Sequence, residues 1–126
     1  MNVETKEKYL KLALKLFGAV FLVVYPLGIV WPSGWVWHGG GGEYYLQMIC
    51  GLYVVLGVYL IKASKNPSEH RSLISFTIWS SVVHGAIMAV QALMDGHEIG
   101  HLLGDVPALF LVAIILWTLS PRKASD

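Results

Sequence analysis

Residues 51–93 read GLYVVLGVYLIKASKNPSEHRSLISFTIWSSVVHGAIMAVQAL, which is two long apolar runs joined by a short charged connection. When the apolar residues on either side of the quoted stretch are included, the two runs cover about residues 44–63 and 72–94. Each then reaches the roughly 20 apolar residues that a helix needs to cross the hydrocarbon core of a bilayer. This stretch therefore predicts two consecutive membrane-spanning helices with a charged turn between them.

The rest of the chain extends the same pattern. Its 126 residues are 56% hydrophobic and 13% charged, and the mean hydropathy is +0.60, which is higher than a soluble domain of this length needs. Further apolar runs lie at about 9–31 and 106–119, and the second of these reaches spanning length only if its helix begins at about residue 97. We therefore expect one domain over residues 1–126, an all-α integral membrane four-helix bundle with a short or kinked fourth helix spanning about 97–119.

The basic residues predict the orientation. All nine Lys and Arg residues lie in the N-terminal tail, in the connection between the second and third spans, or in the C-terminal tail. With four spans these regions share one side, which the positive-inside rule assigns to the cytoplasm. We expect both termini inside (N-in/C-in) and a multi-pass location in the cell inner (plasma) membrane.

The opposite side is expected to hold acidic and aromatic residues together with His38 and the glycine run Gly39–Gly42. The aromatic residues would form a belt at the membrane surface and are Trp31, Trp35, Trp37, Tyr44 and Tyr45. The glycine run favours a flexible hinge, and no GxxxxGK pattern accompanies it. No basic patch with interleaved aromatics occurs either, so neither a nucleotide nor a nucleic-acid partner is expected.

The third apolar run carries a stripe of polar residues at helical spacing. Its members are Thr77, Ser80, Ser81, His84, Met88, Gln91 and Asp95. Eleven residues separate His84 from Asp95, which places the imidazole roughly 16 Å below the outer end of the helix, near the middle of the membrane. An ionisable group at that depth suggests a functional site. The alternative is a neutral histidine that holds helices together by a hydrogen bond to Ser80 or to a phenol such as Tyr53.

Between the third and fourth spans lies DGHEIGHLLGDVP, residues 95–107, with no Lys or Arg. His97, His101 and Asp105 follow one another at intervals of four residues, so a helix through them would place their side chains in one row, where they can converge on a cation. The candidate metal ligands are His84, His97, His101, Asp105, Glu98 and Asp95. Imidazoles with a carboxylate suit zinc or copper.

Helix capping is an alternative explanation of the acidic residues. Asp95 and Glu98 have the spacing of a capping box, and Asp105 precedes Val106-Pro107 as an N-cap residue would. Capping does not account for the two histidines.

Residues 51–93 together with HEIGHLLGDVPAL resemble a family of small bacterial four-helix membrane proteins of unknown function, related to the DoxX-like group. This resemblance covers about residues 10–120 and implies a four-helix fold. A local similarity is to membrane metal hydrolases of the alkaline ceramidase and adiponectin receptor type. It rests on Ser80-x-x-x-His84 and His97-x-x-x-His101 and implies a zinc site in which Asp95 or Asp105 supplies the carboxylate.

Three function classes follow. The first is a membrane protein that binds a divalent transition metal ion, zinc or copper, at an outward-facing His/carboxylate site. The second is a zinc-dependent intramembrane hydrolase in which Glu98 or Asp105 is the general base. The third is a non-catalytic subunit of a larger membrane complex, in which the polar residues only hold helices together.

The sequence also bears on cofactors and partners. Haem is a further alternative, against which stand the single histidine at membrane depth and the absence of a CxxCH attachment motif. The expected partners are membrane lipid and either further copies of the chain or another subunit of a membrane complex. The single cysteine, Cys50, excludes a disulfide within the chain.

Overall fold

The computed structural model describes residues 2–31 and 42–120, and these residues form helices and the turns between them. The elements are α1 (Val3–Leu22), α2 (Val24–Val30), α4 (Gly42–Ala63), the 3-10 turn η1 (Pro67–His70), α5 (Arg71–Met94), the 3-10 segment η2 (Gly96–Leu102) and α6 (Asp105–Leu119). This part of the chain contains no strand, which confirms the all-α class. The expectations for Trp35, Trp37, His38, Gly39–Gly41 and the basic C-terminal tail lie outside the described residues.

The first apolar run forms two helices rather than one. α1 begins at Val3, directly after the N-cap residue Asn2, whose side-chain oxygen accepts a hydrogen bond from the backbone N–H of Thr5 at 2.8 Å. The lysine-rich N-terminal tail is therefore helical too. The helix stops at Leu22, and α2 starts after Val23. Pro26 explains the break, because a proline ring clashes with the carbonyl four residues earlier, which here belongs to Leu22.

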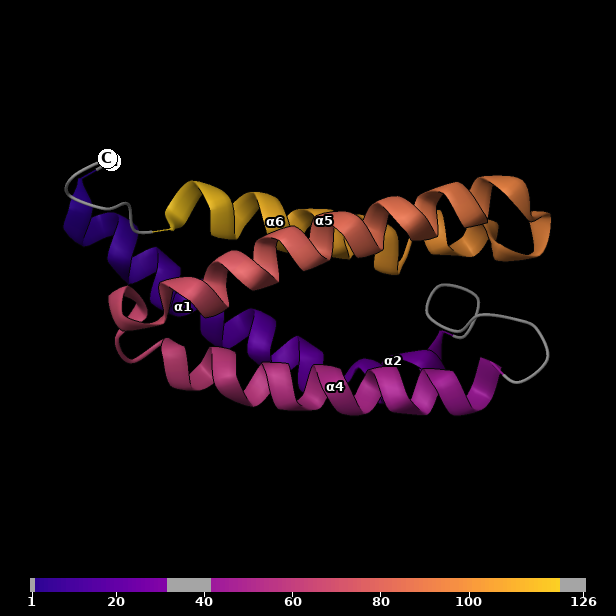
Figure 1. Cartoon of the computed structure of the whole chain (residues 1–126), viewed down its shortest axis with the longest axis horizontal. Coiled ribbons are helices and arrows are strands. Elements are labelled where there is room, and N and C mark those ends of the chain that lie inside the picture. Colours follow the sequence, from indigo (N-terminus) through magenta and orange to yellow (C-terminus); the bar gives the residue numbers. More distant parts are fainter. Residues whose placement is uncertain (1, 32–41, 121–126) are drawn as a thin grey trace.

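The helices pack as two pairs, α1 with α4 and α5 with α6 (Figure 1). Gly18 and Gly57 let α1 and α4 approach closely: a Cβ added at Gly57 would lie 2.6 Å from the carbonyl oxygen of Gly18. Gly85 of α5 similarly faces α6, where an added Cβ would lie 3.3 Å from the ring of Phe110. The small-residue positions therefore set the distances within each pair.

The two pairs are joined by an apolar core at the end of the molecule where α1 begins and α4 ends. Its fully buried residues come from all four long helices and include Leu10, Leu14, Leu60, Ile74 and Leu116. Toward the opposite end the pairs diverge (Figure 1), and a smaller cluster of Met88, Val106 and Leu109 holds α5 and α6 together there. The packing between the pairs is thus tight at one end only.

Three helical segments are long and apolar enough to cross a membrane, consistent with a membrane protein. They are Tyr44–Ala63, Pro67–Met94 and Gly96–Leu119, with 20, 28 and 24 residues. The last includes η2, so the fourth predicted span does use the histidine-rich segment, and the chain changes from 3-10 to α-helix at Leu103 and Gly104. α1 is not among the three, because several lysines lie within it.

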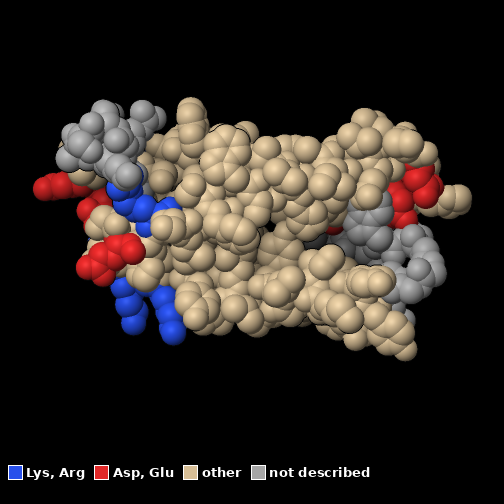
Figure 2. Space-filling view, in the orientation of Figure 1, with Lys and Arg blue, Asp and Glu red and all other residues tan. Residues whose placement is uncertain are grey.

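Charge is distributed unequally between the two ends. In the space-filling view Lys and Arg appear at one end, whereas the opposite end shows Asp and Glu alone (Figure 2). The described basic residues that produce this pattern are Lys6, Lys8, Lys11, Lys15, Lys62, Lys65 and Arg71, which lie in α1, at the end of α4 and at the start of α5. The turn from α5 through η2 to α6 therefore lies at the end of the molecule where the described residues include no Lys or Arg.

Candidate functional site

Asp95 and His97 form the exposed part of the turn between α5 and α6. The carboxylate of Asp95 accepts a hydrogen bond from the backbone N–H of His97 at 3.0 Å and lies 3.2 Å from Nδ1 of the same residue. Their side chains are 56% and 88% exposed. The capping interpretation is thus confirmed for Asp95, and His97 is a surface residue.

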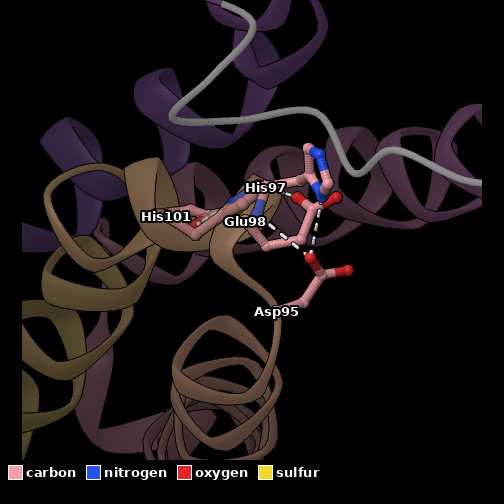
Figure 3. Close-up of polar contacts among 5 residues, drawn as sticks. Asp95, His97, Glu98 and His101 are labelled. Carbon is pink, nitrogen blue, oxygen red and sulfur yellow. Dashed lines mark hydrogen bonds and ion pairs between the residues drawn. The ribbon is translucent and has the colours of Figure 1, made fainter.

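Glu98, His101 and Asp105 form a buried cluster in the same turn. Nδ1 of His101 lies 2.8 and 2.9 Å from the two carboxylate oxygens of Asp105, and Nε2 lies 3.1 Å from Oε2 of Glu98. The exposed fractions of the whole residues are 2% for Glu98, 0% for His101 and 9% for Asp105. Figure 3 shows Glu98 next to His101, whereas His97 lies with Asp95.

Local geometry explains how these three residues meet. In a 3-10 helix, side chains three residues apart lie directly above one another, which brings Glu98 beside His101 within η2. Asp105 is the first residue of α6, and it contacts the histidine four residues before it across the turn at Gly104. Glu98 and Asp105 therefore do not act as simple helix caps, and α6 begins without a side-chain cap.

Both ring nitrogens of His101 lie close to carboxylate oxygens. A neutral histidine carries a single N–H, yet both ring nitrogens face carboxylate oxygens here. Because both nitrogens are engaged, neither is directed at an open position where a metal ion could bind.

The structure does not assemble the predicted ligands into one metal centre. Within residues 2–31 and 42–120, no group of three or more His, Cys, Asp or Glu side chains is arranged to hold a metal ion. His101 lies with Glu98 and Asp105, His97 is at the surface, and His84 belongs to a different contact in α5. Metal binding remains a prediction.

His84 pairs with Tyr53 of α4, which confirms the hydrogen-bond partner suggested by the sequence. The phenol oxygen lies 2.6 Å from Nδ1 of the imidazole, and the two rings stack with centroids 5.9 Å apart. Phe21 of α1 packs edge-on against the other side of Tyr53, at 5.0 Å between centroids. Ser80, the other suggested partner, donates instead to the backbone oxygen of Thr77 at 3.3 Å.

A cavity of about 300 Å³ lies between the two helix pairs, where they diverge. Most of its lining is apolar and comes from α1, α2, α4, α5 and α6, but four polar side chains reach it: Tyr53, His84, Gln91 and Asp105. The cavity thus has the His84–Tyr53 pair and one member of the buried cluster in its wall. The helical spacing of the polar residues predicted that His84 and Gln91 face inward, but it did not indicate the cavity, because the cavity depends on the divergence of the two helix pairs.

Comparison with known proteins places the chain in a family but assigns no activity. A family model for a family of unknown function, DUF6632, matches residues 4–125. No curated protein and no solved structure matches the chain. A relation to the DoxX-like group or to the ceramidase and adiponectin receptor type of hydrolase is not shown, because the matching family carries neither description. The expectation of a family without assigned function is confirmed: the chain belongs to the DUF6632 family.

Proposed function

We propose that this protein binds an amphipathic, lipid-like ligand in the cavity between its two helix pairs. The observation that carries the proposal is a cavity of about 300 Å³ with an apolar wall and a few polar groups. Ligand sites in proteins have this composition, with volumes of roughly 300–1,000 Å³. At roughly 30 Å³ for each water-sized group, a cavity of about 300 Å³ accepts on the order of ten such groups, which matches a ten-carbon chain.

The polar wall would orient the ligand. Tyr53 and His84 are bonded to each other through Nδ1, and no described residue is a partner of Nε2 of His84. That nitrogen is available to a polar head group, while the hydrocarbon part contacts residues such as Leu109 and Met88. When a bound ligand excludes water from Nε2, that nitrogen needs a hydrogen-bond partner on the ligand, since leaving a buried polar group without one costs about 1–3 kcal/mol of free energy.

The experiment closes the cavity and measures binding. Ala108 lines the cavity, and Ala108→Trp would fill it with an indole ring, whereas Ala86→Trp adds the same ring on the exposed face of α5. Native mass spectrometry in detergent micelles would measure the bound fraction of decanol. We expect decanol to bind the wild type and Ala86→Trp and to be lost from Ala108→Trp. Equal binding by both variants would place the ligand outside this cavity and reject the proposal.

The proposed membrane arrangement is a four-helix bundle with both termini in the cytoplasm, in the cell inner (plasma) membrane, formed by one domain over residues 1–126. Support comes from the separation of charge between the two ends (Figure 2) and from the packing of α1 and α2 against α4, beside which they would form the further crossing. Protease treatment of intact spheroplasts tests the arrangement. A tag at either terminus should survive, and its digestion from outside would disprove N-in/C-in.

Metal binding at the turn between α5 and α6 is a second candidate. It is favoured by the burial of one imidazole and two carboxylates, in which Glu98 and Asp105 each lie within 3.1 Å of a ring nitrogen of His101. A zinc or copper ion would have to displace the proton that the cluster holds, so its binding should weaken as the pH falls. Elemental analysis of untagged wild type and His101→Gln protein tests it. A metal content that is zero or equal in the two samples would end this candidate and, with it, the metal-dependent hydrolase.

A further inference from the structure

The contact between Tyr53 and His84 leaves one polar hydrogen unused. A phenol carries one O–H and a neutral imidazole carries one N–H, whereas a single hydrogen bond, 2.6 Å between the phenol oxygen and Nδ1, joins the two side chains. Among the described residues, neither of these side chains has another hydrogen-bond partner. The pair therefore keeps a free donor, whichever of the two groups donates to the other.

The free donor is the N–H at Nε2 of His84. A phenol is a stronger acid than a neutral imidazole, and an imidazole nitrogen is a stronger base than a phenol oxygen, so the hydroxyl of Tyr53 donates and Nδ1 accepts. The hydrogen bond at Nδ1 then fixes the tautomer that carries its hydrogen on Nε2. His84 is half-buried and lines the cavity between the helix pairs, and Nε2 is not enclosed by protein atoms. A ligand in the cavity can therefore accept a hydrogen bond from it.

The cavity wall favours a neutral head group over a charged one. No Lys or Arg is among the described residues that line the cavity, so a ligand carboxylate would meet no cation to offset its desolvation. Asp105 does line the cavity, but both of its carboxylate oxygens lie within 2.9 Å of Nδ1 of His101. An ammonium head group would have to compete with that contact.

From these observations we infer that the ligand of the cavity is a neutral amphiphile with a carbonyl head group, such as a long-chain ketone or ester, and that Nε2 of His84 donates a hydrogen bond to its carbonyl oxygen. A carbonyl accepts hydrogen bonds and has no polar hydrogen of its own that would need an acceptor in a mostly apolar wall. The inference rests on the proposed function, since it names the head group of the ligand for the same cavity. It gives His84 a role in binding besides the contact between helices.

The test compares methyl octyl ketone with decane, which has the same number of carbons and lacks the oxygen. Dissociation constants in detergent micelles would be measured by native mass spectrometry, from the displacement of bound decanol. The measured quantity is the ratio of the dissociation constant of decane to that of the ketone. Partition of each ligand into the micelle is common to all variants and cancels when their ratios are compared.

The double variant Tyr53→Phe/His84→Phe lacks the donor. It keeps an aromatic ring at both positions and removes both hydrogen-bonding partners together, so neither is left buried without the other. We expect the ratio to be about tenfold lower than in the wild type, in which decane would cover the N–H of His84 without replacing its hydrogen bond to water. Ser80→Ala removes a hydroxyl of α5 that does not line the cavity and should keep the wild-type ratio. The unfolding temperature of each variant verifies that it is folded.

Infrared spectroscopy provides a direct readout of the hydrogen bond. A donor at the carbonyl oxygen lowers the stretching frequency of the C=O bond. With the ketone isotopically labelled at its carbonyl carbon, the frequency in the wild-type complex should therefore be lower than in an apolar solvent. It should return toward the apolar value in the double variant.

The outcomes separate this inference from the proposed function. If decanol does not bind the wild type, the ligand-binding cavity and the carbonyl head group are rejected together. If decanol binds but the ratio is the same in the wild type and the double variant, the cavity stands and the carbonyl inference is overturned. An unshifted carbonyl frequency in the wild-type complex also overturns it, and this result needs no variant.

Discussion

Replacing His101 by Leu tests whether the buried cluster depends on its central imidazole. Leucine has a similar volume, so the change creates little empty space, but it leaves Glu98 and Asp105 buried without the group that lies 2.8 to 3.1 Å from their oxygens. Removing one partner from a buried ion pair generally costs about 3–5 kcal/mol, because the remaining charge is left unpaired. We expect the free energy of unfolding of His101→Leu to fall by about that amount.

The control is His97→Leu in the same turn. His97 pairs with Asp95 at a similar distance of 3.2 Å, but its side chain is 88% exposed, so the expected change is within about 0.5 kcal/mol. Unfolding by added sodium dodecyl sulfate, followed by tryptophan fluorescence, would measure all variants. Adding Asp105→Asn to His101→Leu removes one unpaired charge and should recover part of the loss. If His101→Leu is no less stable than His97→Leu, the cluster is not an ionic contact and the reasoning is refuted.

Two further predictions concern packing and the His84 contact. Gly57→Ala should lower the free energy of unfolding by about 1–3 kcal/mol, since its new Cβ would lie 2.6 Å from a backbone oxygen of α1, whereas Gly51→Ala meets nothing within 4 Å and should be neutral or stabilising. Equal stability of the two glycine variants in the same unfolding assay would contradict the close approach of α1 and α4. Tyr53→Phe keeps the ring against Phe21 but removes the 2.6 Å hydrogen bond to His84, and should cost roughly 0.6–1.7 kcal/mol. That cost should disappear in a His84→Ala background, and its persistence there would show that Tyr53 acts through another contact.

The sequence by itself determined the properties that depend on local composition and periodicity. Runs of about 20 apolar residues predicted membrane-spanning helices, and 44–63 and 72–94 agree closely with the observed segments. The 3.6-residue period placed His84 on an inward-facing stripe, and Tyr53 was already named as a possible hydrogen-bond partner. The break between α1 and α2 also had a local signal in Pro26, although the first span was expected to be continuous.

Only the tertiary structure decided how the polar residues of the turn are shared between surface and interior. A regular α-helix would have put His97, His101 and Asp105 in one row, but η2 is a 3-10 helix, and its three-residue repeat brings Glu98 beside His101 instead. Burial against α5 then enclosed that pair with Asp105, while His97 stayed in solvent. The cavity likewise has no local signal, because it arises where two helix pairs, packed tightly at one end, diverge at the other. Contacts between residues far apart in the chain set that divergence, and the spacing of residues within a single helix does not encode it.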